Sequence, residues 1–365
     1  MKVLYDHQIF YTQKYGGISR YFFELMREFR SFKEVEVLFP TIFSNNYYLS
    51  NSEAIHNITY NLNNKHLINA ITKYNSLNTN IKLRLGNYDV FHPTYYNPKF
   101  LKYLRKKPFV LTVHDMTHEK YKHLFSADDK TSEKKRYLVE KARKIIAVSE
   151  NTKRDLVDLF GIEESKVDVV YHGNSIIQEN ILESFTQQLP AKYLLFVGGR
   201  WGYKNFENFI KAITPILADN QELSIVCTGG GDFIRQETEL FSKLKIQNRV
   251  FQYSVNDSGL GYIYRNAICF VFPSLYEGFG IPILEAFSNQ CPVVCSDTSS
   301  LPEVAGEAAC YFDPNDLDSI FESVQQVLSD HALQHELISK GLKRVELFSW
   351  EKTAAKTKLV YESIL

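Results

Sequence analysis

Short apolar runs and helix-like segments alternate along most of this 365-residue chain. The runs at 109–113, 193–197 and 268–272 are rich in β-branched and aromatic residues and are followed by polar, glycine or proline residues. Strands that alternate with helices in this way form βαβ units, whose helices cover both faces of a mainly parallel sheet. The chain is therefore predicted to have an α/β fold.

The alternation occurs in two similar halves, and a polar stretch at 173–190 is interpreted as the linker between them. We predict one domain over 1–185, a second over 186–349 and a C-terminal helix over 350–365. Expected strands lie near 1–6, 35–40, 89–92, 109–113, 145–148, 167–170, 193–197, 223–227, 249–252, 268–272, 292–295 and 310. Expected helices in the first half lie at 17–30, 130–142 and 151–160. Segment 41–80, rich in Asn, Tyr and Ser, is predicted to be an irregular insertion or mobile loop.

Composition narrows the class of protein. The chain is 44% apolar and 23% charged, which is ordinary for a soluble globular protein. It holds no apolar run near the ~18 residues of a membrane-spanning helix, and Asp6 comes too early for a secretory signal. The five cysteines are expected to be free, mostly buried thiols. A cytoplasmic protein is therefore expected.

Charge is balanced over the whole chain but not between its halves. Residues 1–185 hold 27 Lys and Arg against 21 Asp and Glu, and residues 186–365 hold 15 against 21. The excess of basic residues in the first half would suit an anionic acceptor or a membrane surface. Charges scattered over the surface without a role are the alternative explanation. Neither a basic stripe nor a nucleic-acid-binding motif is present, so no nucleic-acid partner is expected.

The segment 276–286 reads Tyr-Glu-Gly-Phe-Gly-Ile-Pro-Ile-Leu-Glu-Ala. Gly278 and Gly280 can adopt positive φ and let a ligand approach the backbone closely. Pro282 suits the first position of a helix, where its missing N–H costs nothing. A helix that begins near Ile281 would direct free N–H groups and a positive dipole end at an anion. The segment is therefore a candidate phosphate site.

Two carboxylates, Glu277 and Glu285, flank this turn. Glu277 is expected on the loop and Glu285 in the first turn of the helix, so each can bind the hydroxyls of a different part of one ligand. A solvated helix face also produces glutamates at this spacing. The apolar run before the turn and the segment at 291–297 after it give the order strand, glycine turn, helix, strand, which is the context of a phosphate site. This chemistry suits a sugar joined to a phosphate.

The segment resembles the Glu-x7-Glu signature of the retaining glycosyltransferases of family 4. The resemblance covers nearly the whole chain and is weakest from 41 to 85. It implies the GT-B fold, in which two Rossmann-like domains face each other across a cleft, with the C-terminal helix crossing back to the first domain. It also implies that Glu277 binds sugar hydroxyls and stabilises an oxocarbenium-like transition state, and that Glu285 binds the ribose. Backbone contacts to the donor are implied for Gly278, Phe279, Gly280 and Ile281.

The first strand of the second half is followed by Gly198-Gly-Arg-Trp-Gly-Tyr-Lys204-Asn. Glycine after a strand permits close approach to a phosphate, while Arg200 offers a bidentate fork and Lys204 a point charge. A solvent-exposed turn is the alternative. The segment resembles the Gly-Arg…Lys-Asn motif of the family, which implies that Arg200 and Lys204 hold the donor diphosphate and offset the charge on the leaving group.

Gly16 and Gly17 form a glycine turn at the start of the first long helix. The resemblance places such a loop near the diphosphate and the acceptor. Arg20 either binds an acceptor phosphate or faces solvent.

His114 and Asp115 follow an apolar run at the end of a predicted strand. A lone histidine is more often structural than catalytic. The resemblance implies that His114 hydrogen-bonds hydroxyls of the donor sugar and that Asp115 lies on the acceptor side. Asp115 is also expected to orient the histidine and fix its tautomer.

The segment 251–255, which includes Tyr253 and Val255, corresponds to the place where relatives hold the nucleotide base through backbone contacts. The family usually has Gly where this chain has Tyr253, which leaves the base undetermined. Asp316 and Asp318 form the only Asp-x-Asp and are interpreted as acids that complement a helix dipole. No metal and no cofactor are expected.

Together these features predict a retaining hexosyltransferase that moves a sugar from a nucleotide diphosphate sugar to a glycan or lipid-linked acceptor. No residue is an obvious covalent nucleophile, so same-face attack is favoured, with the departing phosphate as the base. His7-Gln-Ile-Phe and the segment 15–22 resemble bacterial enzymes of surface polysaccharide synthesis such as O-antigen, capsule or lipopolysaccharide. They favour GDP-mannose over a UDP-sugar and allow a peripheral position at the inner face of the membrane. A GT-B sugar-nucleotide epimerase and a non-catalytic sugar-nucleotide-binding protein remain alternatives.

Overall fold

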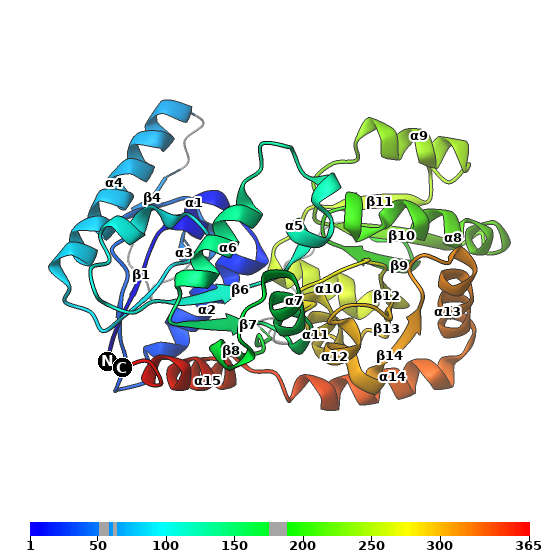
Figure 1. Cartoon of the computed structure of the whole chain (residues 1–365). Helices are drawn as coiled ribbons and strands as arrows, with labels where there is room; N and C mark the ends of the chain where they lie inside the picture. Colours follow the sequence, from blue (N-terminus) through cyan, green and yellow to red (C-terminus); the bar gives the residue numbers. More distant parts are fainter. Residues whose placement is uncertain (51–57, 61–63, 175–187) are drawn as a thin grey trace. The chain divides into compact units, whose positions relative to one another are not determined.

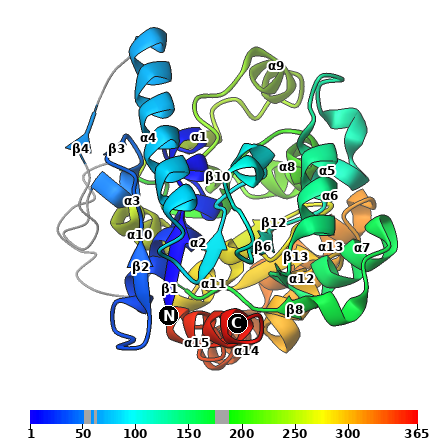
Figure 2. The same cartoon turned by 60° about the vertical axis from the view of Figure 1, so that its left-hand side comes forward.

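The computed structural model describes residues 1–50, 58–60, 64–174 and 188–365. These residues divide into two compact units, shown in Figures 1 and 2. Unit 1 comprises Met1–Gly173 and Trp350–Leu365, and unit 2 comprises Asn174–Ser349. The domain boundary expected at 185/186 and most of the expected linker lie outside the described residues.

Unit 2 contains one sheet of six parallel strands in the order β11-β10-β9-β12-β13-β14. The chain starts in the middle of the sheet, adds strands towards one edge and then returns to build the other half. This order is that of the doubly wound dinucleotide-binding fold. The strands are β9 (Lys192–Val197), β10 (Leu223–Thr228), β11 (Val250–Tyr253), β12 (Cys269–Phe272), β13 (Val293–Ser296) and β14 (Ala309–Phe312).

Unit 1 is also built on parallel strands, in two three-stranded sheets with the orders β2-β1-β5 and β6-β7-β8. A parallel bridge joins Phe91 of β5 to Phe109, which lies just before β6. The two sheets therefore meet at this edge, and their strands run in the same direction. The strands are β1 (Lys2–Tyr5), β2 (Glu36–Leu38), β5 (Val90–His92), β6 (Val110–Val113), β7 (Lys144–Ala147) and β8 (Val167–Val169). A separate parallel pair joins β3 (Phe43–Ser44) to β4 (Ile58–Thr59).

Helices cover both faces of the unit 2 sheet, because the residues of its central strands are buried on both sides. Leu194 and Phe196 of β9 join an apolar cluster with α8 (Phe206–Asp219) and α13 (Leu317–Ser329). Tyr193 points to the opposite face, where its hydroxyl donates to Ile263 O of α10 (Asp257–Asn266). The other helices of this unit are α9 (Arg235–Lys243), α11 (Ile281–Ser288), α12 (Leu301–Ala305), α14 (His331–Val345) and the 3-10 turns η5 (Gly202–Lys204) and η6 (Gly306–Ala308).

The C-terminal helix α15 (Trp350–Glu362) belongs to unit 1, where it packs against α2 (Gly17–Phe29). The Tyr361 hydroxyl lies 2.8 Å from the Tyr5 hydroxyl and 2.6 Å from His92 Nδ1, deep in the core. The other helices of unit 1 are α1 (Gln8–Thr12), α3 (Tyr47–Ser50), α4 (Lys65–Leu85), α5 (Thr117–Lys120), α6 (Thr131–Lys141), α7 (Glu150–Phe160) and the 3-10 turns η1 (Pro98–Lys102), η2 (Lys122–Leu124) and η3 (Glu164–Lys166).

The predicted α/β class, the strands and the helices of the first half are confirmed, with ends that differ by one or two residues. The expectation for segment 41–80 is wrong over its second part, because α4 forms 21 continuous residues from Lys65. Asn64 caps this helix by accepting hydrogen bonds from His66 N and Leu67 N, and Gly86 ends it with φ +75°. The rest of that segment holds α3, β3 and β4, and 51–57 and 61–63 lie outside the described residues.

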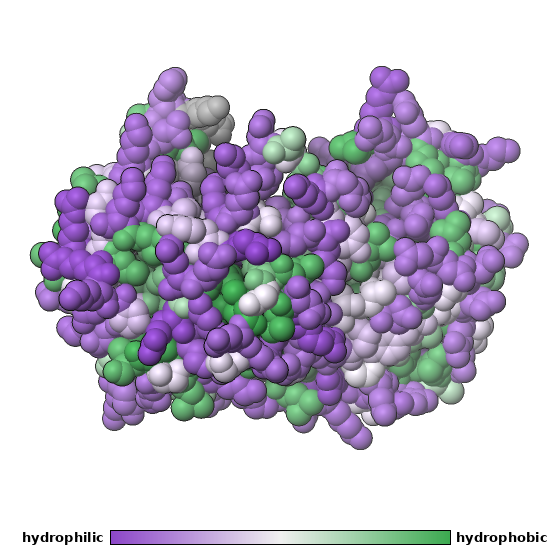
Figure 3. All heavy atoms as spheres, viewed as in Figure 1, coloured by the Kyte–Doolittle hydropathy of each residue, from purple (hydrophilic) through white to green (hydrophobic). Residues whose placement is uncertain are grey.

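Among the helices that the structure describes, none is long and apolar enough to cross a membrane. On the face seen in Figure 3, hydrophilic residues predominate and hydrophobic residues form separate islands between them.

Candidate functional site

The strand order of unit 2 reverses between β9 and β12, which lie side by side at its centre. In open parallel sheets, ligands bind outside the carboxyl ends of the strands at such a reversal. The loop after β9 carries Gly198, Arg200 and Lys204, and the loop after β12 carries Glu277 and the glycine turn. The topology therefore brings the two predicted motifs to one edge of the sheet.

Lys204 and Glu277 form an ion pair at this edge. Lys204 Nζ lies 2.6 Å from Glu277 Oε1, and the same oxygen accepts a hydrogen bond of 2.7 Å from Ser274 Oγ. The two side chains are only 18% and 14% exposed, so the pair is partly shielded from water. A carboxylate and an ammonium held together in this way can face hydroxyl and phosphate groups of one ligand.

The glycine turn gives the start of α11 a fixed geometry. Gly280 has φ +105° and caps α11, and a Cβ at this position would lie 2.9 Å from Leu301 Cδ2. Gly278 is not among the residues with positive φ, so of the two glycines that can adopt it only Gly280 does so. Ser300 Oγ lies 2.9 Å from both Glu277 O and Phe279 O, where it holds the turn against the following loop.

Glu285 lies in the second turn of α11 and not in its first, which corrects the sequence-based expectation. Because α11 begins at Ile281, Glu285 is its fifth residue. The side chain is buried, and its Oε2 accepts a hydrogen bond of 3.2 Å from Tyr264 Oη. A buried carboxylate fixed by a tyrosine is a rigid acceptor for ligand hydroxyls.

Arg200 makes its contacts within the protein. Nε donates to Glu237 Oε1 at 2.8 Å, Nη1 to Gly229 O at 2.9 Å, and Nη2 to Gly231 O and Asp232 O at 2.9 and 3.0 Å. The side chain is 3% exposed. In this structure the guanidinium therefore braces the loop 229–232, whereas the sequence suggested that it holds a diphosphate directly.

The braced loop contains three consecutive glycines whose φ values are all positive. A Cβ at Gly230 would lie 3.0 Å from Arg200 Nη1 and 3.1 Å from Gly198 O. Only glycine fits at this position, because the loop wraps closely around the guanidinium and the end of β9. The backbone at the carboxyl ends of β9 and β10 is thus shaped by Arg200.

Tyr253 and Val255 lie beyond β10, at the end of β11 and on the loop that follows. The Tyr253 hydroxyl donates to Gln188 O at 2.8 Å. Asn256 caps α10 by accepting from Gly259 N. Lys204 and Glu277 follow the central strands β9 and β12, whereas this loop follows β11 at the edge of the sheet. It is therefore the part of the predicted nucleotide site that lies the most strands away from that pair.

Unit 1 has a groove of about 460 Å³ at the carboxyl ends of β1 and β5, the strands between which its own order reverses. Most of the residues that line it are polar, although apolar parts of their side chains contribute much of its surface. They come from the segment after β1, from α4 and from the segment at η1: Asp6, His7, Gln8, Asn69, Thr72, Lys73, Ser76, Leu77, Thr79, Asn80, Asn97, Lys99 and Phe100. Sequence reasoning noticed the segment that begins at His7 only as a resemblance, and did not predict this groove.

Hydrogen bonds fix the two loops of the groove to each other. Asp6 Oδ1 accepts from Thr94 N and Thr94 Oγ at 2.9 and 2.6 Å, and Gln8 Oε1 accepts from Asn97 N at 2.8 Å. Among the described residues, the buried Nδ1 of His7 has no hydrogen-bond partner. Burial lowers the pKa of His7 despite the opposing charge of Asp6, which keeps the ring neutral and able to bind a hydroxyl.

His114 lies at the end of β6 with its ring against Tyr21, at a centroid distance of 5.0 Å. It is 8% exposed, and neither ring nitrogen has a partner among the described residues. Burial lowers its pKa to about 4; Asp115 opposes this shift and Lys135 adds to it. At neutral pH the ring therefore offers one N–H donor and one acceptor.

Asp115 does not orient His114, which corrects the sequence-based expectation. Its Oδ1 accepts from Thr117 N at 2.9 Å instead. Burial would raise the pKa of Asp115, but Lys135 and the hydrogen bonds from Thr117 outweigh it and leave that pKa below its ordinary value. The buried Lys135 ammonium also bonds Asp115 O and Glu119 Oε2, both at 2.8 Å, and so holds this loop together.

Arg20 neither faces solvent nor extends freely from the glycine turn. It is 4% exposed; its Nε donates to the Tyr48 hydroxyl at 3.1 Å and Nη2 to the Tyr15 hydroxyl at 3.3 Å. The turn before it is tight, because a Cβ at Gly16 would lie 2.6 Å from Gln13 Oε1. Gly17 is the first residue of α2.

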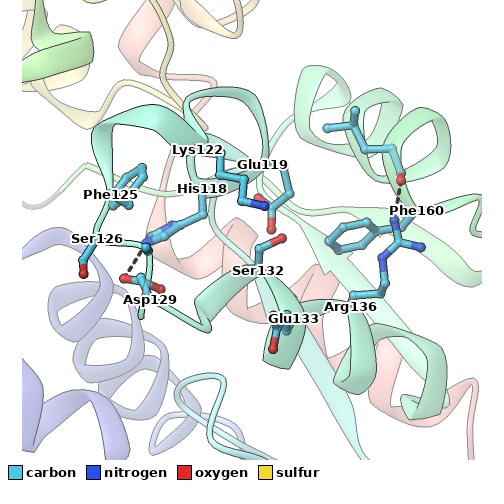
Figure 4. Close-up of a pocket in the computed structure, with 12 residues that line it drawn as sticks. His118, Glu119, Lys122, Phe125, Ser126, Asp129, Ser132, Glu133, Arg136 and Phe160 are labelled. Carbon is cyan, nitrogen blue, oxygen red and sulfur yellow. Dashed lines mark hydrogen bonds and ion pairs between the residues drawn. The ribbon is translucent and has the colours of Figure 1, made fainter.

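A second hollow of unit 1, of about 330 Å³, lies between the segment 118–136, which runs from α5 into α6, and the end of α7 (Figure 4). His118 stacks on Phe125 at 4.0 Å, and its Nε2 is 3.8 Å from Asp129. Arg136 lies over the Phe160 ring and donates to Leu159 O. Sequence reasoning did not predict this hollow, and it assigned none of these residues a role.

The chain matches two family models that together span most of its length. Residues 177–344 match glycosyl transferases group 1, and residues 15–175 match glycosyltransferase family 4. An uncharacterized glycosyltransferase of Methanocaldococcus jannaschii is 31% identical over 299 residues, which cover 77% of this chain and 76% of the relative. The chain belongs to the group 1 glycosyltransferases.

Other glycosyltransferases are similar in sequence or in fold. O-antigen chain mannosyltransferase B of Escherichia coli is 29% identical over 290 residues, which cover 73% of this chain and 74% of the relative. Sucrose-phosphate synthase from Thermosynechococcus elongatus has a TM-score of 0.76 at 18% identity, with 100% of this chain and 98% of that chain covered. HepE from Anabaena in complex with UDP and glucose has a TM-score of 0.75 at 15% identity and covers 99% of both chains. These structures establish the GT-B fold.

Within this glycosyltransferase, each predicted site residue can now be placed. The Glu277 and Lys204 side chains meet directly, and Gly280 and Ile281 start α11 as predicted. His114, Arg20 and Asp115 belong to unit 1. Among the residues that the structure describes, no group of three or more His, Cys, Asp or Glu has an arrangement that would hold a metal ion.

Proposed function

We propose that this glycosyltransferase moves a hexose, preferably mannose from GDP-mannose, to a hydroxyl of a glycan or lipid-linked acceptor and retains the anomeric configuration. The observation that carries the proposal is the Lys204–Glu277 pair beside the start of α11, at the strand reversal of unit 2. Relatives named as O-antigen mannosyltransferases support the mannosyl donor and a role in polysaccharide synthesis.

In this proposal the donor diphosphate lies against the N–H groups that begin α11 and against Lys204. Helix N-termini bind phosphate through free N–H groups and the helix dipole. Arg200 does not contact the diphosphate in this proposal. It acts indirectly, because it holds the 229–232 loop beside Gly198. Glu277 binds sugar hydroxyls, Glu285 binds the ribose, and the backbone near Tyr253 and Val255 receives the base.

The proposed reaction breaks the bond between the anomeric carbon and the diphosphate oxygen and forms a bond from that carbon to the acceptor oxygen on the same face. The acceptor hydroxyl gives its proton to the departing phosphate oxygen, so the reaction needs neither a covalent protein intermediate nor a metal. Lys204 offsets the charge that grows on the leaving diphosphate, and Glu277 the positive charge on the sugar ring. The neutral His114 is proposed to hydrogen-bond the sugar.

The groove of unit 1 is the proposed acceptor site. Its amides, hydroxyls and His7 match the hydroxyls of a glycan, and Lys73 and Lys99 can meet a phosphate of a lipid carrier. We therefore propose that Asp6, His7 and Asn97 bind the acceptor. Arg20, whose guanidinium bonds the Tyr48 and Tyr15 hydroxyls, is proposed to support the glycine turn at Gly16 and Gly17.

The first test is a thermal-shift panel of GDP, UDP, ADP and dTDP with their sugars on the wild type and on Lys204→Ala. A nucleotide at 100 times its Kd should stabilise the wild type by about 2.7 kcal/mol and the variant much less. Lys192→Ala is the matched control, since Lys192 makes an exposed ion pair with Glu222. If no nucleotide stabilises the wild type, the donor site is misplaced; if the stabilising nucleotide sugar is converted to its epimer without transfer, the epimerase alternative holds.

A further inference from the structure

Helix α4 departs in part from the pattern of an ordinary surface helix. Its buried side chains are Leu83, which is 0% exposed, and the polar Asn75 and Thr79, each 3% exposed. The Asn75 amide pairs with the edge of β3, where it accepts from Ile42 N and Phe43 N and donates to Phe43 O at 2.7 Å. A surface helix normally buries apolar residues and exposes polar ones. Polar contacts of Asn75 thus anchor part of the inner side of α4 beside the buried Leu83, while several large apolar residues lie on the exposed side.

The outer side of α4 carries an apolar stripe. Its five large apolar residues are between 44% and 59% exposed: Leu67, Tyr74, Leu77, Ile81 and Leu85. At helical spacing they fall within about 80° of the helix circumference. The helix is about 31 Å long. In Figures 1 and 2 it lies at the margin of unit 1, and one end extends beyond the neighbouring elements.

Cations border this stripe on both sides. Lys73 and Arg84 fall on one flank and Lys82 on the other, and all three are exposed. The Arg84 guanidinium also lies over the Tyr103 ring at 4.7 Å. The sequence of α4 contains no Asp or Glu. Long basic side chains beside an apolar face can reach lipid headgroups while the apolar residues enter the boundary of the acyl chains.

We propose that α4 docks on an anionic membrane surface, with the apolar stripe embedded and Lys73, Lys82 and Arg84 at the headgroups. A second copy of this chain fits the same face poorly, since the pairing would bring cations against cations. This docking deepens the proposed function, because it would hold the neighbouring groove of unit 1 near a lipid-linked acceptor. The docking surface itself consists of residues of α4 alone.

The test is co-sedimentation of the full chain with vesicles, measured without donor or acceptor. Vesicles of equal parts phosphatidylcholine and phosphatidylglycerol are compared with pure phosphatidylcholine at low and high salt. We expect binding to the anionic vesicles that weakens with salt, and little binding to the neutral ones. Lys82→Gln/Arg84→Gln should weaken binding about 30-fold, at roughly 1 kcal/mol for each cation. Ile81→Ser/Leu85→Ser should weaken it about tenfold or more.

The matched control is Leu347→Ser/Leu359→Ser, which removes two exposed leucines away from α4 and should leave binding unchanged. All variants are checked by thermal unfolding, and sedimentation velocity reports self-association. Equal affinity of the wild type for both vesicle types, or equal binding by the stripe variants and the control, overturns the proposal. So does stripe-dependent dimerisation in the absence of vesicle binding. Because the assay contains no sugar nucleotide, its outcome is independent of the donor test.

Discussion

The two units hold the polar groups at the carboxyl ends of their strands in different states. In unit 2 the charged groups are already paired, Lys204 with Glu277 and Arg200 with Glu237. In unit 1, His7 after β1 and His114 after β6 keep buried nitrogens without partners among the described residues. Paired charges give a preorganised site for a charged ligand, whereas unpaired buried polar atoms cost free energy until a ligand binds them. The difference suits a charged donor on unit 2 and an uncharged, hydroxyl-rich group on unit 1.

The largest expected effect comes from breaking the paired state of unit 2 at Arg200. Arg200→Met leaves Glu237 without its partner and three carbonyls of the 229–232 loop without donors. We expect a loss of about 3–5 kcal/mol in the free energy of unfolding, measured by denaturant titration.

The matched control for this change is Arg235→Met, which removes an exposed pair with Glu239 and should cost less than about 1 kcal/mol. If Arg200→Met keeps its stability and loses only nucleotide binding, Arg200 is a ligand contact and the bracing role is wrong.

Glu277→Gln should lower kcat by about 10²–10³, because it removes a charge placed to stabilise the sugar in the transition state. Its shape is nearly unchanged, so nucleotide binding should persist. Initial rates and thermal shifts on the same preparations separate the two effects. Glu222→Gln, at an exposed pair, is the control. A variant with full kcat would remove Glu277 from the chemistry.

The buried His114 of unit 1 should make the stability of the protein depend on pH. Its folded-state pKa of about 4 lies below the value of about 6.5 in the unfolded chain. The unfolded chain therefore binds more protons between these values, and stability falls as pH drops from 6.5 towards 4. His114→Phe keeps the ring packing and should reduce this acid loss by up to about 3 kcal/mol.

Urea titrations at several pH values measure that loss. His335→Phe, at an exposed position, is the matched control. The buried His92 has a pKa lowered to about 3 for the same reason, so part of the acid loss should remain in His114→Phe. An unchanged acid profile would mean that His114 is not held neutral by burial.

The smallest expected effect is at the glycine turn of unit 2. Gly280→Ala places a side chain at φ +105° and close to Leu301, which should cost about 1–2 kcal/mol. Gly278→Ala should cost less, because that residue does not use positive φ. Thermal unfolding of both variants distinguishes them, and equal losses would contradict the turn geometry.

The sequence by itself determined the α/β class, the strand positions and the motifs that follow β9 and β12. Those features depend on local patterns: apolar runs of strand length, glycines after strands and the Gly-x-Pro start of α11. Lys204 and Glu277 were both singled out, although their contact joins residues 73 apart in sequence.

Only the tertiary structure decided which groups have partners. Arg200 binds a loop 29 to 32 residues downstream, and no local pattern announces that its donors are used there. Distant segments also decide three other features. They leave the ring nitrogens of His114 without partners among the described residues, form the groove beside His7, and bury Asn75 and Thr79 of α4. Helix α4 was not predicted because Asn75 and Thr79 lie beside Leu83 on its buried side while five large apolar residues are exposed, which weakens the usual signal of a surface helix. Short-range periodicity fixes where elements form, whereas burial and pairing are set by contacts between elements that the chain brings together only on folding.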